Sequence, residues 1–356
     1  KAARKRSPNL YPETDPNKVP KWRPFQLAFI LLNLSSLVDK AHPDREAVDL
    51  LFFPTGGGKT EAYLGLAAFA ITHRRLTAGE AGSGVTVIMR YTLRLLTLDQ
   101  LARAAGVVCA LELARTDPAH ADDRGQKHLG EWPIEIGLWV GSDASPNRLG
   151  GRGDTGDETA VTRVRKYRNN PQREKAPAPI KACPWCGTPF KPESFQCVPN
   201  SISPRNLEIR CANDSCEFTG DRALPVLTVD EPIYRRLPAF LIATVDKFAG
   251  LPWVGESGGF FGHVDRIDES VGFYGAADPG IGRKLFNADE LLPPDLIIQD
   301  ELHLISGPLG TVAGLYETAI DELSTRYRGE KRIRPKIVAS TATVRRAADQ
   351  IRLLFD

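Results

Sequence analysis

The sequence predicts an α/β fold built on a parallel, doubly wound sheet that carries helices on both faces. The main observation is that short β-branched, apolar runs alternate with segments whose apolar residues recur at helical spacing. Alternating strands and helices form βαβ units, which make the strands parallel and cover both faces of the sheet. The composition agrees, because 42% hydrophobic and 25% charged residues are ordinary for a globular domain.

The first half of the chain contains three expected helices and three expected strands. The helices cover about 24–38, 60–75 and 93–108, where apolar residues repeat at helical spacing. The strands are "AVDLLFFP", "GVTVIMRY" and "IEIGLWVG", each rich in β-branched or aromatic residues.

The second half begins with a long interruption of this pattern. Residues 142–180 are polar, Gly-rich and Arg-rich, with one helical stretch around "ETAVTRVRKYR", and a cysteine module follows at about 181–225. Strand patterns return in "AFLIATVDKF", "DLIIQDELHLI" and "KIVASTAT", with a helix between the last two. The Gly-rich segment 272–286 could be a mobile gate or a plain connector, and the sequence favours neither.

Length, charge and cysteine usage exclude several classes of protein. A chain of 356 residues can form one large α/β domain or two ordinary ones. The net charge of +2 is too small to indicate a nucleic-acid partner by itself. No apolar run is as long as a membrane span, no signal peptide is recognisable, and six cysteines do not suggest a secreted disulfide scaffold. We therefore expect a cytoplasmic protein without a membrane partner. Because the chain stops inside the helix-like pattern "RRAADQIRLLFD", we also expect a longer parent polypeptide.

The stretch "LLFFPTGGGKTEAYL" runs from an apolar strand through three glycines into a helix, which is the context of a phosphate-binding loop. Glycines let backbone N–H groups converge on phosphate oxygens, and the helix N-terminus adds the positive end of its dipole. Lys59 would reach the β- and γ-phosphates, and the Thr60 hydroxyl would ligate Mg²⁺. The strict motif requires glycine where Phe53 stands, whereas a variant with Gly56 and Gly58 fits. The alternative is a Gly-rich turn with a chance lysine.

A phosphate loop also needs a metal-holding carboxylate and a group that activates water. "PDLIIQDELHLI" offers both at the end of an apolar strand, where open α/β sheets place their ligands. Asp300 would hold Mg²⁺ through water, and Glu301 would orient and polarise the attacking water. Alternatively, Glu301 is a solvated surface acid and His303 a satisfied polar residue under a loop.

With these residues in view, the chain resembles the superfamily 2 DExH-box helicases and translocases. "PTGGGKT" looks like their motif I, "DELH" like motif II and "STATV" like motif III, and the order along the chain is right. "RPFQ" resembles the upstream element whose glutamine reads adenine, "RYTLRLLTLDQLARA" motif Ia, and "IATVDKF" motif Ib. The fold implied is the first RecA-like domain, interrupted by one insertion. A closer resemblance, in "FPTGGGKTEAYLGLAAF" and "QDELHLISGPLGT", is to the DrmA family of helicase subunits of DISARM anti-phage systems.

The resemblance implies roles for particular residues. The catalytic set is Lys59, Asp300, Glu301 and His303. ATP and Mg²⁺ would be held by Gln26, Thr55, Gly56, Gly57, Gly58, Lys59, Thr60 and Asp300, with Thr60 and Asp300 on the metal. Thr341 and Thr343 would couple the nucleotide site to the strand-binding face, and nucleic acid would contact Thr92, Arg94, Thr244 and Lys247.

Two departures from the family pattern matter. Motif II follows motif I far later than in these helicases, since Asp300 lies 241 residues after Lys59, so an insertion must interrupt the core domain. The chain also lacks a second RecA-like domain with the arginine fingers that accelerate phosphoryl transfer. We therefore expect this piece to bind nucleotide and to hydrolyse it poorly alone. The expected divisions are a basic tail (1–22), a first half of the RecA-like domain (23–141), the insertion (142–235) and a second half (236–356).

The insertion carries a predicted zinc site. "CPWC" and "CANDSC" place Cys183 and Cys186 about two dozen residues before Cys211 and Cys216, which is zinc-ribbon spacing. Four thiolates around Zn²⁺ would be structural and leave no open position for chemistry. Cys197 is expected to be unligated, although it could replace one cysteine of the second pair.

The role of this ribbon stays open between nucleic-acid contact and protein docking. Basic residues lead into it (Arg163, Arg165, Lys166, Arg168, Arg173, Lys175 and Lys181), yet such a charge run is usually a solvated face. The preferred hypothesis is an ATP-dependent nucleic-acid motor. Its partners would be nucleic acid, expected to be DNA that is single-stranded or has single-stranded ends, the second RecA-like domain, and defence subunits such as DrmB. The rivals are an ATP-gated scaffold that does not translocate and a metabolic P-loop enzyme, for which motifs Ia, Ib and III would have no role.

Overall fold

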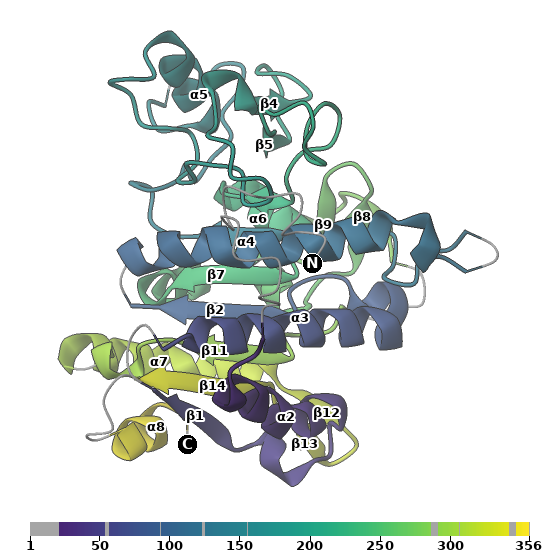
Figure 1. Cartoon of the computed structure of the whole chain (residues 1–356), viewed down its shortest axis with the longest axis vertical. Coiled ribbons are helices and arrows are strands. Elements are labelled where there is room, and N and C mark those ends of the chain that lie inside the picture. The colour runs from purple at the N-terminus through teal and green to yellow at the C-terminus, as the bar shows by residue number, and fades with distance from the viewer. Residues whose placement is uncertain are drawn as a thin grey trace.

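The computed structural model of the chain describes the backbone of residues 21–53, 57–92, 94–122, 125–154, 156–285, 291–305, 307–341 and 347–355, and omits the side chains of 94–99, 307–308, 328 and 347–348. Its centre is a seven-stranded sheet in which every neighbouring pair is parallel (Figure 1). The spatial order is β1 (Val48–Phe52), β14 (Lys336–Thr341), β11 (Leu296–Gln299), β2 (Val87–Tyr91), β7 (Phe240–Thr244), β3 (Ile136–Trp139) and β6 (Val226–Leu227). The predicted parallel α/β sheet is confirmed, and it fits a RecA-like domain.

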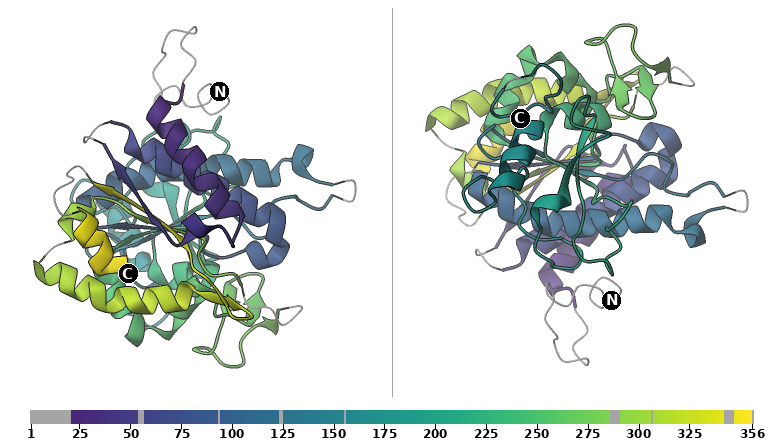
Figure 2. Two further views of the ribbon diagram at one scale, coloured as in Figure 1. Left: turned by 90° about the horizontal axis from the view of Figure 1, so that it is seen from below. Right: turned by 90° about the horizontal axis from the view of Figure 1, so that it is seen from above.

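Helices cover both faces of the sheet (Figure 2). On one face lie α2 (Pro24–Val38), α3 (Lys59–Ala78) and α4 (Arg94–Thr116), and on the other α6 (Asp230–Arg236), α7 (Gly307–Ser324) and α8 (Ala347–Phe355). Alternate strand residues point to opposite faces, so Val87 and Met89 join the core under α3 and α4 while Ile88 joins the core under α7. Burial on both faces explains why the strands read as continuous apolar runs.

Two helix starts near the carboxyl end of β1 follow from local sequence. Pro24 occupies the first turn of α2, where backbone N–H groups have no carbonyl partner within the helix, so the N–H that proline lacks is not needed. The N–H of the preceding residue, Arg23, donates to Gln26 Oε1 at 2.9 Å. Helix α3 begins at Lys59 because the preceding residue, Gly58, takes φ +90°. This is not a right-handed helical conformation, and residues with a Cβ atom disfavour it. The start of α3 is therefore one residue earlier than the sequence predicts.

The cysteine module stands apart from the sheet, over helix α4 (Figure 1). It contains α5 (Ala160–Asn169) and an antiparallel hairpin of β4 (Phe195–Val198) and β5 (Asn206–Ile209). Strand β6 falls within the segment predicted as an insertion, yet it pairs with β3 as an edge strand of the main sheet. The chain therefore returns to the core before the predicted end of the insertion.

The Gly-rich segment 272–286 contributes to a small antiparallel sheet. This sheet consists of β8 (Arg266–Asp268), β9 (Gly272–Tyr274) and β10 (Arg283–Lys284), in the order β10-β8-β9. Arg266 ties the loop between β9 and β10 down by donating to Asp278 O at 2.7 Å and Gly275 O at 2.5 Å. The small sheet lies beside the end of the main sheet where its strands begin (Figure 1), which favours the connector interpretation over a gate at the carboxyl edge. Phe286 lies outside the described residues.

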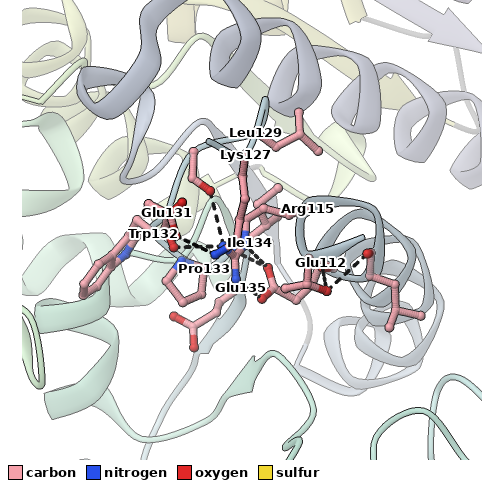
Figure 3. A network of polar contacts seen from close by, with 12 residues as sticks. Glu112, Arg115, Lys127, Leu129, Glu131, Trp132, Pro133, Ile134 and Glu135 are labelled. Atoms are coloured by element: carbon pink, nitrogen blue, oxygen red, sulfur yellow. Dashed lines mark hydrogen bonds and ion pairs between the residues drawn. The ribbon is translucent and has the colours of Figure 1, made fainter. Parts of the chain in front are cut away.

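A polar network fastens the segment that enters β3 (Figure 3). Glu112 on α4 accepts from the N–H of Ile134 at 2.8 Å and pairs with Arg115, while Arg115 donates to Glu131 O at 2.9 Å. Arg75 at the end of α3 donates to Trp132 O at 2.9 Å. These contacts satisfy backbone carbonyls at the amino end of the sheet, so the network is structural and lies at the edge opposite the candidate site.

A second buried cluster centres on Asp295, immediately before β11. Its carboxylate lies 2.5 Å from Lys40 Nζ, 3.4 Å from Arg45 Nη2 and 3.7 Å from Arg74 Nη1, which joins α2, α3 and the sheet. Burial raises the pKa of the Asp295 carboxyl, but Arg74 and Lys40 lower it by more, so the pKa lies below its ordinary value. This contribution to stability is present above the ordinary carboxyl pKa and is lost as the pH falls through the lower folded value.

We expect Asp295→Asn to lower the free energy of unfolding by about 3–5 kcal/mol, because it leaves Arg45 and Arg74 buried without their counter-charge. Urea titration followed by circular dichroism measures this. The control is Asp157→Asn, whose carboxylate pairs with Lys166 on the surface and is 83% exposed; we expect a change within about 0.5 kcal/mol. Equal stability of the two variants would show that the cluster is not stabilising.

Candidate functional site

The carboxyl ends of β1, β14 and β11 form one edge of the sheet, and the candidate site lies there. β1 leads towards the glycine loop, and Gly58 and Lys59 follow; β11 leads into Asp300 and Glu301. Only β14 separates the two strands, so they are about 10 Å apart. A cavity of about 470 Å³ opens between them, lined among others by Gln26, Gly58, Lys59, Thr60, Asp300 and Glu301.

Lys59 and Glu301 face each other across this cavity. Lys59 Nζ lies 4.0 Å from Glu301 Oε1, and the lysine side chain is only 7% exposed. Nζ has no hydrogen-bond partner among the described residues. A buried ammonium without hydrogen bonds is unfavourable. The cavity therefore fits an anionic ligand that would supply them, such as a phosphate chain.

Asp300 is buried beside the neighbouring strand. The pairing of Gln299 with Ala339 continues to place Asp300 next to Ser340, whose Oγ donates to Asp300 Oδ1. The N–H of Glu301 donates to the same oxygen at 3.0 Å. The Asp300 carboxylate is thus held in place at the cavity wall with the Thr60 hydroxyl, and hard oxygen donors of this kind suit Mg²⁺.

Two tyrosines complete the surroundings of Asp300. Burial raises the pKa of the Tyr63 and Tyr91 hydroxyls, and the nearby Asp300 carboxylate raises it further. Both phenols therefore stay neutral beside the acidic pair.

Glu301 has a strained backbone and a tethered side chain. Its φ of +48° and ψ of +49° lie in the left-handed region, which residues other than glycine, asparagine and aspartate seldom adopt. His303 Nδ1 lies 3.3 Å from Glu301 Oε2 and 3.3 Å from Thr341 Oγ1. His303 therefore connects the acidic pair to the end of β14, which carries the motif III-like sequence.

The predicted adenine-reading residue, Gln26, is bound to the glycine loop. Gln26 Nε2 donates to Gly58 O at 2.7 Å, and Arg23 Nη1 donates to Gly57 O at 2.5 Å. A carboxamide has two donor hydrogens and two acceptor lone pairs, so Gln26 keeps one of each after its bonds to Gly58 and Arg23. Adenine presents a matching donor and acceptor at N6 and N7.

Several predicted site residues cannot be placed. Thr55, Gly56 and Thr343 lie outside the described residues, as does the side chain of Arg94. Thr341 is described; it is buried, and its hydroxyl faces His303.

The predicted nucleic-acid contacts are only partly available at the surface. Thr92 follows β2 and Thr244 ends β7, and these strands are neighbours in the sheet. Neither hydroxyl has a hydrogen-bond partner in the part of the chain that is described. Lys247, predicted to contact nucleic acid, is paired within the protein. Its Nζ lies 2.5 Å from Asp230 Oδ2 and 5.6 Å from the centre of the Trp139 ring. Burial raises the pKa of Asp230 to about 6, although Lys247 opposes that shift.

The four predicted metal ligands come together. Their Sγ atoms all lie within 4.8 Å of one another, with Cys186 3.4 Å from Cys211 and Cys183 3.9 Å from Cys216. Tetrahedral Zn²⁺ with Zn–S bonds of about 2.3 Å separates its sulfurs by about 3.8 Å. Gly187 takes φ +76°, as the tight turn after the first pair requires. The cluster could therefore hold a metal ion such as zinc.

The remaining cysteines lie outside this cluster. Cys197 on β4 is half-buried, and burial raises its pKa to about 11, whereas Cys109 is buried within α4. Of the basic residues that lead into the cysteine module, at least one is already paired within the protein. Arg163 is buried and bonded to Glu158 and Ser142 O.

Several residues of the candidate site were not found from sequence; one is buried behind Asp300, and the others line the cavity. Ser340 could have been located from the strand order, because it is opposite Asp300 once β14 and β11 pair. The others carry charge or hydrogen-bonding groups at the cavity wall, and they are Lys21, Arg23, Glu61, Tyr91, Gln100 and Arg103. Gln100 and Arg103 are one turn apart on α4, so they share a helix face, but nothing in the sequence indicates that this face points to the cavity.

Comparisons with known proteins agree with the closer resemblance. No family model matches the chain. The chain is similar to a protein named DISARM protein DrmA from Bacillus paralicheniformis, with 42% identity over 349 residues. The match covers 94% of the chain and 30% of the relative, so the chain spans about 30% of the length of this relative. Within the described ranges, we find no helix both long and apolar enough to span a bilayer.

Proposed function

We propose that this chain is the nucleotide-binding domain of an ATP-dependent nucleic-acid motor of the superfamily 2 helicase type, acting in anti-phage defence. The observation that carries the proposal is the meeting of Lys59 with Asp300 and Glu301 at one cavity. The similarity to DISARM protein DrmA supports the defence role.

ATP with Mg²⁺ would supply the phosphoanhydride bond whose hydrolysis drives the motor. Lys59 would neutralise phosphate charge, and Thr60 with Asp300 would hold the cation. Glu301 would orient a water molecule and accept its proton, in an orientation that His303 stabilises. Gln26 would hydrogen-bond the base with the donor and acceptor left free by Gly58 and Arg23.

The proposal includes partners beyond this chain. A second RecA-like domain would bring the arginine that accelerates phosphoryl transfer, so this domain alone would turn over slowly. DNA would cross the carboxyl edge near Thr92 and Thr244, with Lys247 contributing only if it leaves Asp230. Other subunits of the defence system, such as DrmB, would complete a cytoplasmic complex, and the four cysteines would hold Zn²⁺.

Turnover of ATP by the complete polypeptide tests this function. We expect phosphate release to increase severalfold when single-stranded DNA is added, with duplex DNA and RNA compared at the same salt concentration because nucleic-acid binding depends on salt. An ATP-gated scaffold would behave differently, since its subunits would assemble with ATP while no nucleic acid changed its turnover. That second result would contradict the motor.

A further inference from the structure

A second cavity adjoins the candidate phosphate site. It has a volume of about 660 Å³ and lies between α3 and α4, with walls that include Trp22, Leu64, Ala68, Ala102 and Val107. Four residues line both cavities, namely Lys21, Gln26, Glu61 and Arg103. The two cavities are therefore compartments of one site, and we call the second one the α3–α4 compartment.

The cysteine module supplies one wall of this compartment. Pro184, between Cys183 and Cys186 in the sequence, lines the α3–α4 compartment together with Gly106 of α4. The contact is close, because a Cβ atom built on Gly106 would lie 3.3 Å from Pro184 O. Figure 1 shows α4 running between the module and α3. A single helix, α4, therefore lies between the metal cluster and the candidate nucleotide site, and it contacts the module on one side and the site on the other.

The two compartments differ in chemistry. The first is lined by Lys59, Thr60 and the acidic pair, which suit a phosphate chain and its cation. The α3–α4 compartment is mainly apolar, with an indole at one side and small aliphatic side chains along the helices. From Lys59 to Ala68, α3 advances nine residues, or about 13 Å, which is comparable to the length of a nucleoside triphosphate. Gln26 stands at the junction with its free amide hydrogen and lone pair.

We propose that the α3–α4 compartment receives the base and ribose of the nucleotide, and that the Cys183–Cys186 turn is part of its wall, so metal binding by the four cysteines raises nucleotide affinity. This inference rests on the proposed function. A flat, partly apolar base fits between Trp22 and the aliphatic wall, while its polar edge meets Gln26. Loss of the metal would release Pro184 from α4 and open that wall.

Filling the compartment tests the inference without touching the phosphate cavity. In the complete polypeptide, Ala102→Phe and, separately, Ala68→Phe place a ring in the α3–α4 compartment from either helix. Calorimetric titration with Mg·ATP and with inorganic tripolyphosphate then separates the two compartments. We expect each variant to bind Mg·ATP about tenfold or more weakly and tripolyphosphate as the unmodified protein does. Ala110→Phe, on the exposed side of α4 beyond the compartment, is the matched control and should change neither affinity.

Removing the metal is the second arm of the experiment. Cys183→Ser combined with Cys186→Ser should weaken Mg·ATP binding by a similar factor and leave tripolyphosphate binding unchanged. Retained tripolyphosphate binding shows in each case that the domain is folded. Unchanged ATP affinity in the Phe variants and the cysteine variant would overturn the inference while the proposed function stands. If the unmodified protein binds neither ATP nor tripolyphosphate, the proposed function itself fails.

Discussion

Replacing Glu301 with glutamine is expected to lower nucleic-acid-stimulated ATP turnover of the complete polypeptide by at least about a hundredfold, with binding of Mg·ATP retained. Glutamine keeps the size of the side chain and can still accept a hydrogen bond from His303, but it cannot take a proton from water. It also removes the negative charge that lies 4.0 Å from Lys59, which does not weaken the attraction of that lysine for phosphate. Steady-state phosphate release and calorimetric titration measure the two effects separately.

The matched control for this substitution is Glu322→Gln. Glu322 lies on α7 with an exposed side chain far along the helix from the acidic pair, and its hydrogen bond is to Tyr327. ATP turnover by the Glu322→Gln variant should equal that of the unmodified protein. If Glu301→Gln retained more than half of the turnover, Glu301 would not be the group that activates water.

Loss of the metal from the four-cysteine cluster is expected to unfold the cysteine module while the main sheet stays folded. Structural zinc sites of this kind contribute apparent binding energies of about 10–16 kcal/mol in small zinc-binding peptides, and without that contribution the module would depend on its buried side chains alone. Those side chains include Trp185 and Phe218, whose rings pack edge to face with 6.0 Å between the ring centroids. Substituting Cys183 by serine removes one ligand and should therefore remove the metal.

Metal analysis and hydrogen exchange measure this outcome. The unmodified protein should contain one zinc ion per chain. In Cys183→Ser, amides of β4 and β5 should exchange rapidly while those of β2 and β11 remain protected. Cys197→Ser is the control, because Cys197 lies outside the cluster and should leave the zinc content unchanged. A zinc-free unmodified protein, or loss of zinc in the control, would contradict the assigned ligand set.

The main strands and helices could be predicted from sequence because both faces of the sheet are buried. Strands such as β2 and β7 are buried at every position and mainly apolar, and their neighbours α3 and α4 show helical spacing. The small strands were missed because their sequences are short, and several of them are polar. β10 (Arg283–Lys284) is exposed, and the hairpin of β12 (Arg326–Arg328) and β13 (Lys331–Ile333) is strongly basic, so neither has the apolar alternation that marks a strand.

The candidate site could be predicted as far as it depends on strand ends. Parallel strands bring their carboxyl ends to one edge, so Lys59 after β1 and Asp300 after β11 were expected to meet, and they line one cavity. Tertiary pairing is a different matter, because it depends on residues far apart in the sequence. The ion pair of Lys247 with Asp230, and the approach of Pro184 to Gly106, have no local signal.

The central claim is that Lys59 and the Asp300–Glu301 pair form one binding site for a nucleoside triphosphate with its metal ion. The most direct measurement is a calorimetric titration of Mg·ATP into the complete polypeptide and into its Lys59→Ala variant, each checked for folding by circular dichroism. We predict saturable binding to a single site in the first and no measurable binding in the second. Equal binding by the two proteins, or none by either, would contradict the account.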